Sequence, residues 1–350
     1  MRKSIYLDEL RKLAKRMEDM PNTPYAMYAK VVTLVTINMR YEKVAFRSDL
    51  KKHPFLLARD IVKDARSQFA AFIDASFIEA DEKRAPGDKS RKKEKKHRQL
   101  FDEIWNRYGK KDYKRYVDRY SYRIDVNGLA GLVKGKRCID MGCGNGNFCI
   151  ALLKRGAAFA AGVDYGNKSI SYARNAAREF GMKDRTLFKC ATVYDTGFKD
   201  NMFDFAIQNG VFHHLDNEDM AIAETRRIMK KGGWLWYYTD GEGGISPDLW
   251  DKSVYLLRKV PVLFIENILK SMNIKPNKIV HIMDGLSATY AHTSWKKITE
   301  KLSSFGFGNF RRLTGGFDTD FDLDRIEADP YGKEKFGSGD LRVLCQLVEK

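Results

Sequence analysis

The sequence has few cysteines, and none of them form a metal or redox motif. The five lie at positions 138, 143, 149, 190 and 345, and no two have the spacing of a CxxC pair. An odd number without that spacing favours free thiols over a disulfide framework. We therefore expect a protein of a reducing compartment.

Long apolar runs are also absent. The longest, residues 31–39, is interrupted by Thr and Asn and flanked by Lys30 and Arg40. It falls far short of the ~20 residues that cross a bilayer. The N-terminal residues carry acidic side chains and no continuous apolar stretch, so we expect no signal peptide. The prediction is a soluble, cytoplasmic protein.

Clustered metal ligands are lacking too. The six histidines are scattered, and only the adjacent pair His213 and His214 has a spacing that suits a shared ligand. We expect no metal site. At 350 residues the chain is long enough for two domains with a sizeable core.

Positive charge is abundant and uneven. The net charge is +17, and residues 1–125 hold 31 Lys and Arg against 19 Asp and Glu, a net +12. Residues 83–98 alone carry nine basic and two acidic side chains. Such a run is usually a solvated linker, and a polyanion-binding role is the alternative.

The most informative stretch is residues 137–150, RCIDMGCGNGNFCI. Its first part suits a buried strand, and from Asn145 onward it becomes helical. Glycines at 142, 144 and 146 permit positive φ and let a ligand approach bare backbone at a helix N-terminus. A dinucleotide fingerprint would need a third glycine at position 147, which is Asn147. Asp140 precedes the glycines, and a carboxylate on a buried strand needs a partner.

This Asp-x-Gly-x-Gly-x-Gly pattern resembles motif I of the class I S-adenosylmethionine (SAM) dependent methyltransferases. Residues 157–165 follow as a second strand ending in Asp164, residues 203–215 resemble motif IV, and residues 223–237 resemble the helix, Gly-Gly turn and fifth strand after it. The resemblance covers about residues 99–350. It implies a Rossmann-like, doubly wound α/β sheet of seven strands with an antiparallel last strand, and SAM as cofactor.

The resemblance also implies a division of the chain. We expect a helical N-terminal region at 1–80, a basic linker at 81–98 and a methyltransferase domain at 99–350. Within that domain, residues 241–293 are an apolar insertion that in this family caps the active site and shapes the acceptor pocket. The N-terminal helices carry apolar stripes that need a partner, either each other, the catalytic domain or another subunit.

Cofactor residues are implied by position within these motifs. Asp164 should hold the ribose, Tyr165 should pack on the adenine, and Arg123, with Tyr116 and Tyr122, could face the methionyl end. In this family an acidic residue at the end of the third strand often contacts the adenine amino group. Here the matching residues, Lys189 to Thr192, include no acid, so the Ala191 backbone or Asp195 could make this contact instead. The full expected set is Asp140, Gly142, Cys143, Gly144, Asn145, Asp164, Tyr165, Cys190, Ala191, Asn209 and Arg123.

Catalytic residues are harder to predict, because methyl transfer mainly needs alignment and sometimes a base. His213 and His214 follow the fourth strand, and either can act as a base near neutral pH. His-His-Leu is common at this place in the family, so one imidazole can serve only to pack the loop. Asp284 and Tyr290 in the insertion are further candidates.

Three functions follow from these features. The first is a methyltransferase for a small molecule or biosynthetic intermediate enclosed by the 241–293 insertion. The second is an RNA methyltransferase that uses the basic, tyrosine-rich segment 83–123. The third is a non-catalytic SAM-binding subunit of a complex. The oligomeric state is not readable from the sequence.

Overall fold

A computed structural model describes residues 3–74, 110–287 and 291–349. The described chain divides into two compact units. The sheet unit comprises residues 110–242, 291–323 and 338–349, and the helical unit comprises residues 3–74, 243–287 and 324–337. The predicted linker 81–98 and the basic run 83–98 lie outside the described residues.

The sheet unit is built on seven strands in the order β3-β2-β1-β4-β5-β7-β6. The strands are β1 (Arg137–Met141), β2 (Phe159–Asp164), β3 (Thr186–Cys190), β4 (Phe203–Asn209), β5 (Met229–Asp240), β6 (Phe307–Arg312) and β7 (Asp340–Leu347). β7 runs antiparallel to both β5 and β6, while the other neighbouring pairs are parallel. The predicted seven-stranded sheet with its antiparallel last strand is confirmed.

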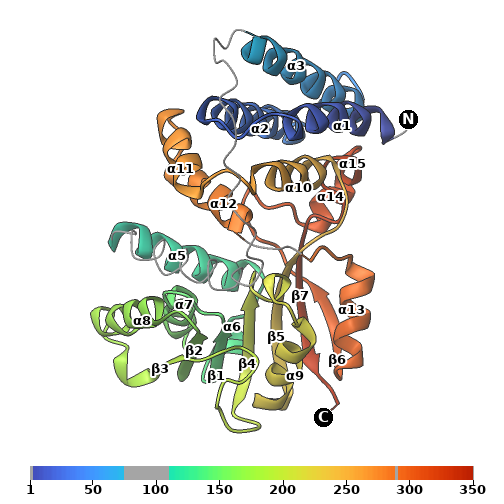
Figure 1. The fold of residues 1–350 in the computed structure, drawn as a ribbon. Coiled ribbons are helices and arrows are strands. Elements are labelled where there is room, and N and C mark those ends of the chain that lie inside the picture. Colours follow the sequence, from blue (N-terminus) through green and yellow to red (C-terminus); the bar gives the residue numbers. More distant parts are fainter. Residues whose placement is uncertain (1–2, 75–109, 288–290, 350) are drawn as a thin grey trace. The chain divides into compact units, whose positions relative to one another are not determined.

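Helices cover both faces of this sheet (Figure 1). They are α5 (Lys110–Val126), α6 (Ala130–Val133), α7 (Asn147–Lys154), α8 (Asn167–Glu179), α9 (Glu218–Ile228) and α13 (Trp295–Ser304), with short 3-10 turns η1 (Lys183–Arg185) and η2 (Phe212–His214). One core cluster joins one face of the sheet to residues of α5, α7 and α8, and a second joins the other face to α9 and α13. This two-sided burial explains why the central strands are nearly continuous apolar runs.

The fifth strand differs from its prediction. The sequence pattern predicts a helix near residues 217–230 and a strand near 234–239, whereas β5 begins at Met229. Met229 pairs with Phe203, and the next paired position is Trp234 with Phe205, so the intervening residues, including the two glycines, form an irregularity within the strand. Between β6 and β7, two short helices that the sequence analysis did not predict interrupt the expected hairpin.

The helical unit joins segments that are distant in the sequence. Its helices are α1 (Ser4–Glu18), α2 (Pro24–Ala45), α3 (Pro54–Asp74), α10 (Ile245–Leu257), α11 (Val262–Ser271), α12 (Pro276–Ser287), α14 (Leu323–Ala328) and α15 (Gly332–Phe336). α2 packs against α3, α10 and α11. A helix with neighbours on several sides buries apolar residues around most of its surface, which accounts for the broad apolar pattern of α2.

Polar contacts tie the insertion to the N-terminal helices. Asn38 on α2 donates a 2.8 Å hydrogen bond to Ser253 on α10, and Tyr6 on α1 donates to Asp248. The insertion is thus grouped with the N-terminal helices, whereas the sequence analysis assigned residues 241–293 to the methyltransferase domain. No helix in the part of the chain that the structure describes is long and apolar enough to cross a membrane.

Candidate active site

The glycine loop after β1 depends on three left-handed residues. Gly142, Gly144 and Gly146 have φ of 89°, 50° and 79°. The amides of Gly142 and Cys143 donate to the Val163 carbonyl on β2, at 2.8 and 2.9 Å. A Cβ built on Gly142 would lie 2.6 Å from a methyl carbon of Val211. The loop therefore needs glycine for its backbone conformation and, at Gly142, also for space.

Asp164 holds the loop from the neighbouring strand. One carboxylate oxygen accepts from the Gly144 amide at 2.9 Å, and the other accepts from the Gly166 amide at 2.8 Å. Asp164 therefore fixes the glycine loop from the end of β2.

A pocket opens where the carboxyl ends of β1, β2 and β4 meet. Its lining residues are Tyr120, Asp140, Gly142, Cys143, Gly144, Asn145, Asn147, Phe148, Asp164, Tyr165, Gly166, Ser169, Asn209, Gly210, Val211 and His214. The cavity measures about 150 Å³, roughly ten times the space that one water molecule needs. The structure thus brings together nine of the residues that the sequence analysis selected: Asp140, Gly142, Cys143, Gly144, Asn145, Asp164, Tyr165, Asn209 and His214.

Helix α5 supports one side of this pocket. The Tyr113 hydroxyl donates to the Asn145 carbonyl at 3.2 Å, and the Tyr120 ring stacks on Phe148 with centroids 4.4 Å apart. Among the tyrosines of this segment we had considered Tyr116 and Tyr122 for ligand contact, yet Tyr120 lines the pocket. The spacing of the buried residues 113, 117 and 124 places Tyr120 on the same helix face, so this signal was available in the sequence.

Three polar atoms in the pocket lack hydrogen-bond partners among the described residues. They are the side-chain amide nitrogens of Asn145 and Asn147 and the side-chain oxygen of Asn209. Buried polar atoms normally have a partner in the protein, in water or in a ligand. The two donors and one acceptor therefore suit a ligand rich in polar groups.

Asp140 adds a carboxyl group to the pocket lining. The residue is buried, and burial together with the charge of Asp164 raises the pKa of its carboxyl to about 8. A cationic ligand group beside it would favour the ionised form.

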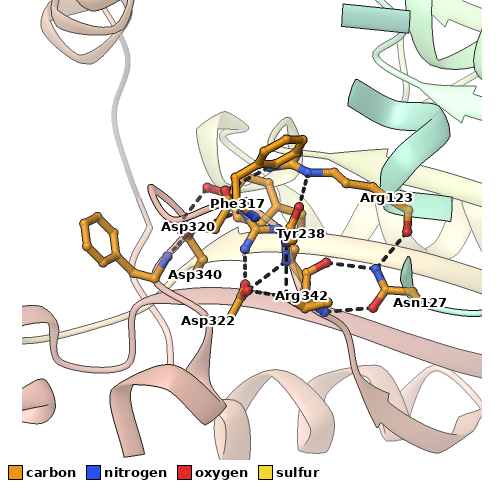
Figure 2. A network of polar contacts seen from close by, with 12 residues as sticks. Arg123, Asn127, Tyr238, Phe317, Asp320, Asp322, Asp340 and Arg342 are labelled. Atoms are coloured by element: carbon orange, nitrogen blue, oxygen red, sulfur yellow. Dashed lines mark hydrogen bonds and ion pairs between the residues drawn. The ribbon is translucent and has the colours of Figure 1, made fainter. Parts of the chain in front are cut away.

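Arg123 lies outside the pocket lining. Its guanidinium donates to Asp320 at 2.9 Å and to the Gly315 carbonyl at 3.1 Å. Figure 2 shows Arg123 and Arg342 meeting at Asp320, with Asp322 and Asp340 close to Arg342. A buried arginine with such partners is held by structural ion pairs, so nothing in this arrangement directs Arg123 to a ligand.

The other predicted residues occupy the surroundings of the pocket. Cys190 is exposed, with its thiol against the Tyr165 carbonyl, and the Ala191 amide donates to the Asp164 carbonyl. His213 is buried beside His214 and does not line the pocket. Tyr290 and the side chain of Asp284 lie outside what the structure describes.

Comparisons with known proteins agree with this geometry. A family model described as a methyltransferase domain matches residues 139–237. Residues 139–237 thus form a class I SAM-dependent methyltransferase domain. Its cofactor is SAM. SAM has a cationic sulfonium, which suits Asp140, and polar groups at its amino acid end and its ribose, which suit the asparagine atoms without partners among the described residues.

This chain is similar over part of its length to known methyltransferases. It is 26% identical over 145 residues to the 27-O-demethylrifamycin SV methyltransferase of Amycolatopsis mediterranei, covering 39% of this chain and 52% of that protein. It is 28% identical over 169 residues to a ubiquinone biosynthesis O-methyltransferase of Neisseria meningitidis, covering 47% and 69%. The chain thus spans about half to two thirds of these relatives.

Solved structures provide a further comparison. A 1,6-didemethyltoxoflavin-N1-methyltransferase of Burkholderia thailandensis, with S-adenosylhomocysteine (SAH) bound, is 14% identical with a TM-score of 0.45, covering 76% of this chain and 93% of that one.

The raised pKa of Asp140 leads to a stability prediction. Above a pH of about 4 the unfolded carboxyl is ionised, while the folded apoprotein keeps it protonated up to about pH 8. The Asp140 carboxyl therefore destabilises the fold increasingly as the pH rises through this window. Asp140→Asn should have the same melting temperature as the wild type near pH 4 and one higher by several degrees at pH 8. Thermal unfolding without ligand measures this, and a variant that is no more stable at pH 8 would contradict the burial argument.

Proposed function

We propose that the protein transfers the methyl group of SAM to a small molecule or biosynthetic intermediate. The observation that carries this proposal is the pocket itself, in which the glycine loop and Asp164 lie beside His214. SAM supplies a methyl group on a sulfonium that is already a good leaving group. The protein's part is then to align the acceptor and to accept a proton where the acceptor carries one.

Each pocket residue has a defined part in this proposal. Asp164 accepts from the ribose hydroxyls, Tyr165 packs on the adenine, and Asp140 faces the cationic methionyl end. Support comes from the place of Asp164 in the pocket lining, at the end of the strand beside the glycine loop, and from the exposure of Tyr165, which also lines the pocket. At the end of β3, Asp195 is hydrogen-bonded to the Gly197 amide, and neither Asp195 nor Ala191 lines the pocket.

An oxygen acceptor is favoured over nitrogen. A hydroxyl must lose its proton as it gains a methyl group, and His214 places an imidazole at the pocket. Two relatives, the 27-O-demethylrifamycin SV methyltransferase and the ubiquinone biosynthesis O-methyltransferase, carry names that refer to small-molecule acceptors.

Methyl transfer from tritiated SAM to a panel of phenols, alcohols and amines tests this function. We expect label in a phenol or alcohol and none in total RNA. SAH binding without transfer to any acceptor would indicate a non-catalytic SAM-binding subunit instead.

RNA binding separates the small-molecule function from the RNA alternative. If the basic, tyrosine-rich segment 83–123 contacted several phosphates, RNA affinity would fall steeply with salt. For a single strand, the slope of log affinity against log salt concentration is roughly −0.7 for each phosphate contacted. On the small-molecule account, the native protein binds RNA weakly, and replacing Lys92, Lys93, Lys95 and Lys96 with Gln leaves SAM binding and methyl transfer unchanged. Fluorescence anisotropy at several salt concentrations measures the slope. Tight binding at physiological salt, with transfer to RNA that the quadruple variant loses, would replace this account with the RNA one.

A further inference from the structure

Exposed apolar side chains gather where α10 ends and α11 begins, in the helical unit. Tyr255 near the end of α10 is 52% exposed, and Val262 and Leu263 in the first turn of α11 are 40% and 67% exposed. Leu263 has the largest exposed fraction of the large apolar side chains that the structure describes. Single exposed apolar residues are normal on a protein surface, whereas a group of them marks an interaction site.

The inner side of the same two helices is packed in the core of the helical unit. Leu257 of α10 and Ile265 and Leu269 of α11 are buried, and both helices pack against α2. The Val260 amide donates to the Leu257 carbonyl at 2.9 Å, which closes the turn between the helices. The turn is therefore held by its own core contacts, and the exposed apolar side chains are not needed for them.

Positive charge accompanies these apolar side chains. Residues 252–278 hold six Lys and Arg but a single acidic residue. Three of the cations form ion pairs: Lys252 with Glu18, Lys270 with Glu266 and Lys278 with Glu42. Arg258 and Lys259, in the turn between the helices, are exposed and form no ion pair with any residue that the structure describes. The first turn of α11 also lacks an acidic residue, so the positive end of the helix adds to their charge.

A further cation lies near this turn. Lys30 on α2 is buried. Burial, and after it the charge of Lys259, lowers the pKa of Lys30, whereas the charge of Glu18 raises it. Lys30 and Lys259 therefore repel each other, and an anionic group that binds at Lys259 would reduce this repulsion. The turn combines an excess of positive charge with exposed apolar side chains.

We propose that this α10–α11 surface, formed by Tyr255, Arg258, Lys259, Val262 and Leu263, binds the surface of a membrane that contains anionic lipid. Val262 and Leu263 enter the boundary between headgroups and acyl chains, where apolar side chains leave water. Tyr255 lies at the level of the headgroups, where tyrosine is favoured. Arg258 and Lys259 attract the anionic headgroups. RNA would account for the two cations but not for the exposed aliphatic side chains, because its phosphates bind polar and cationic groups.

Sedimentation with lipid vesicles tests this without knowledge of the methyl acceptor. The full chain is used with Gln in place of Lys92, Lys93, Lys95 and Lys96, so that the basic run 83–98 contributes less to binding. Vesicles of phosphatidylcholine mixed with phosphatidylglycerol are compared with vesicles of phosphatidylcholine alone. We expect binding to the anionic vesicles to be at least about 10-fold tighter, because each Lys or Arg near an anionic surface contributes roughly a factor of five. Added salt should weaken it.

The apolar part of the surface is tested with Leu263→Ser. This variant should bind anionic vesicles about 10-fold more weakly, because the leucine side chain no longer leaves water on binding. Leu187→Ser on β3 is the matched control, since Leu187 is also exposed, at 41%, and lies in the sheet unit. It should bind as the parent protein does.

The charged part is tested with the double variant Arg258→Gln and Lys259→Gln. It should bind anionic vesicles at least about 10-fold more weakly, by the same factor of roughly five for each cation. Its control is the double variant Lys183→Gln and Arg185→Gln, which removes two exposed cations of η1 and should bind normally. The four changed positions are outside the pocket lining, so unchanged SAH affinity shows that each variant is folded.

Three results would overturn the proposal. The first is equal binding of the parent protein to anionic and neutral vesicles. The second is equal vesicle binding by the Leu263→Ser and Leu187→Ser variants. The third is tight binding of single-stranded RNA that the Arg258→Gln and Lys259→Gln variant loses and Leu263→Ser retains, which would assign the surface to nucleic acid.

Discussion

Asp164→Ala is expected to weaken SAH binding by a factor on the order of 10² to 10⁴. Two charge-assisted hydrogen bonds to the ribose hydroxyls would be lost, each contributing about 1.5 to 3 kcal/mol. The same change also leaves the amides of Gly144 and Gly166 without the carboxylate that now accepts from them. Titration calorimetry of the wild type and the variant measures the difference.

The matched control for this variant is Asp184→Ala. Asp184 is exposed on η1 and is not part of the pocket lining. It should bind SAH as the wild type does. An Asp164→Ala variant that keeps full affinity while folded would show that the carboxylate only supports the loop, and would remove the ribose assignment.

Gly142→Ala is expected to have the second large effect, a loss of SAH affinity of at least about 10-fold. The new Cβ would lie 2.6 and 2.7 Å from the two methyl carbons of Val211, and the residue has a φ of 89° that alanine rarely adopts. Both the crowding and the strain, about 1 to 3 kcal/mol for such a backbone, would displace the loop from the pocket. Calorimetry and thermal unfolding measure binding and stability together.

Two further variants separate strain from crowding. Gly135→Ala has a comparable φ of 73° but no neighbouring atom within 4 Å of the new Cβ, so it should lose some stability and keep its SAH affinity. The double variant with Gly142→Ala and Val211→Ala removes the two methyl carbons and should recover part of the lost affinity. Equal SAH affinity in the Gly142→Ala and Gly135→Ala variants would show that crowding at Gly142 does not matter.

Much of the cofactor side could be predicted because its causes are local. Positive φ at Gly142, Gly144 and Gly146 is a property of the residues themselves, and the strands on either side are short apolar runs. The apolar runs predict strands near residues 137–141, 159–164 and 186–190, and β1, β2 and β3 have these bounds in the structure. Position along the motif was enough to select Asp164, because the end of a parallel strand next to β1 must face the same loop.

The remainder depends on contacts between distant residues. The proximity of Asp240 to His213 follows from the pairing of β4 with β5, which places the ends of the two strands together but gives no local sequence signal. Likewise, one packing partner of α2 in the helical unit is α10, some 200 residues later in the sequence. An apolar stripe indicates that a helix needs a partner without indicating which one.

Hydrogen exchange with and without SAH tests the central claim most directly, because it locates the bound cofactor on the chain. The account predicts that SAH slows exchange at the amides of the glycine loop, residues 142–147, and at residues 165–166 after β2, which together form the pocket. Exchange at β6, on the far edge of the sheet, should stay unchanged. No protection of the glycine loop at saturating SAH, or protection confined to other segments, would contradict the assignment of this pocket as the SAM site.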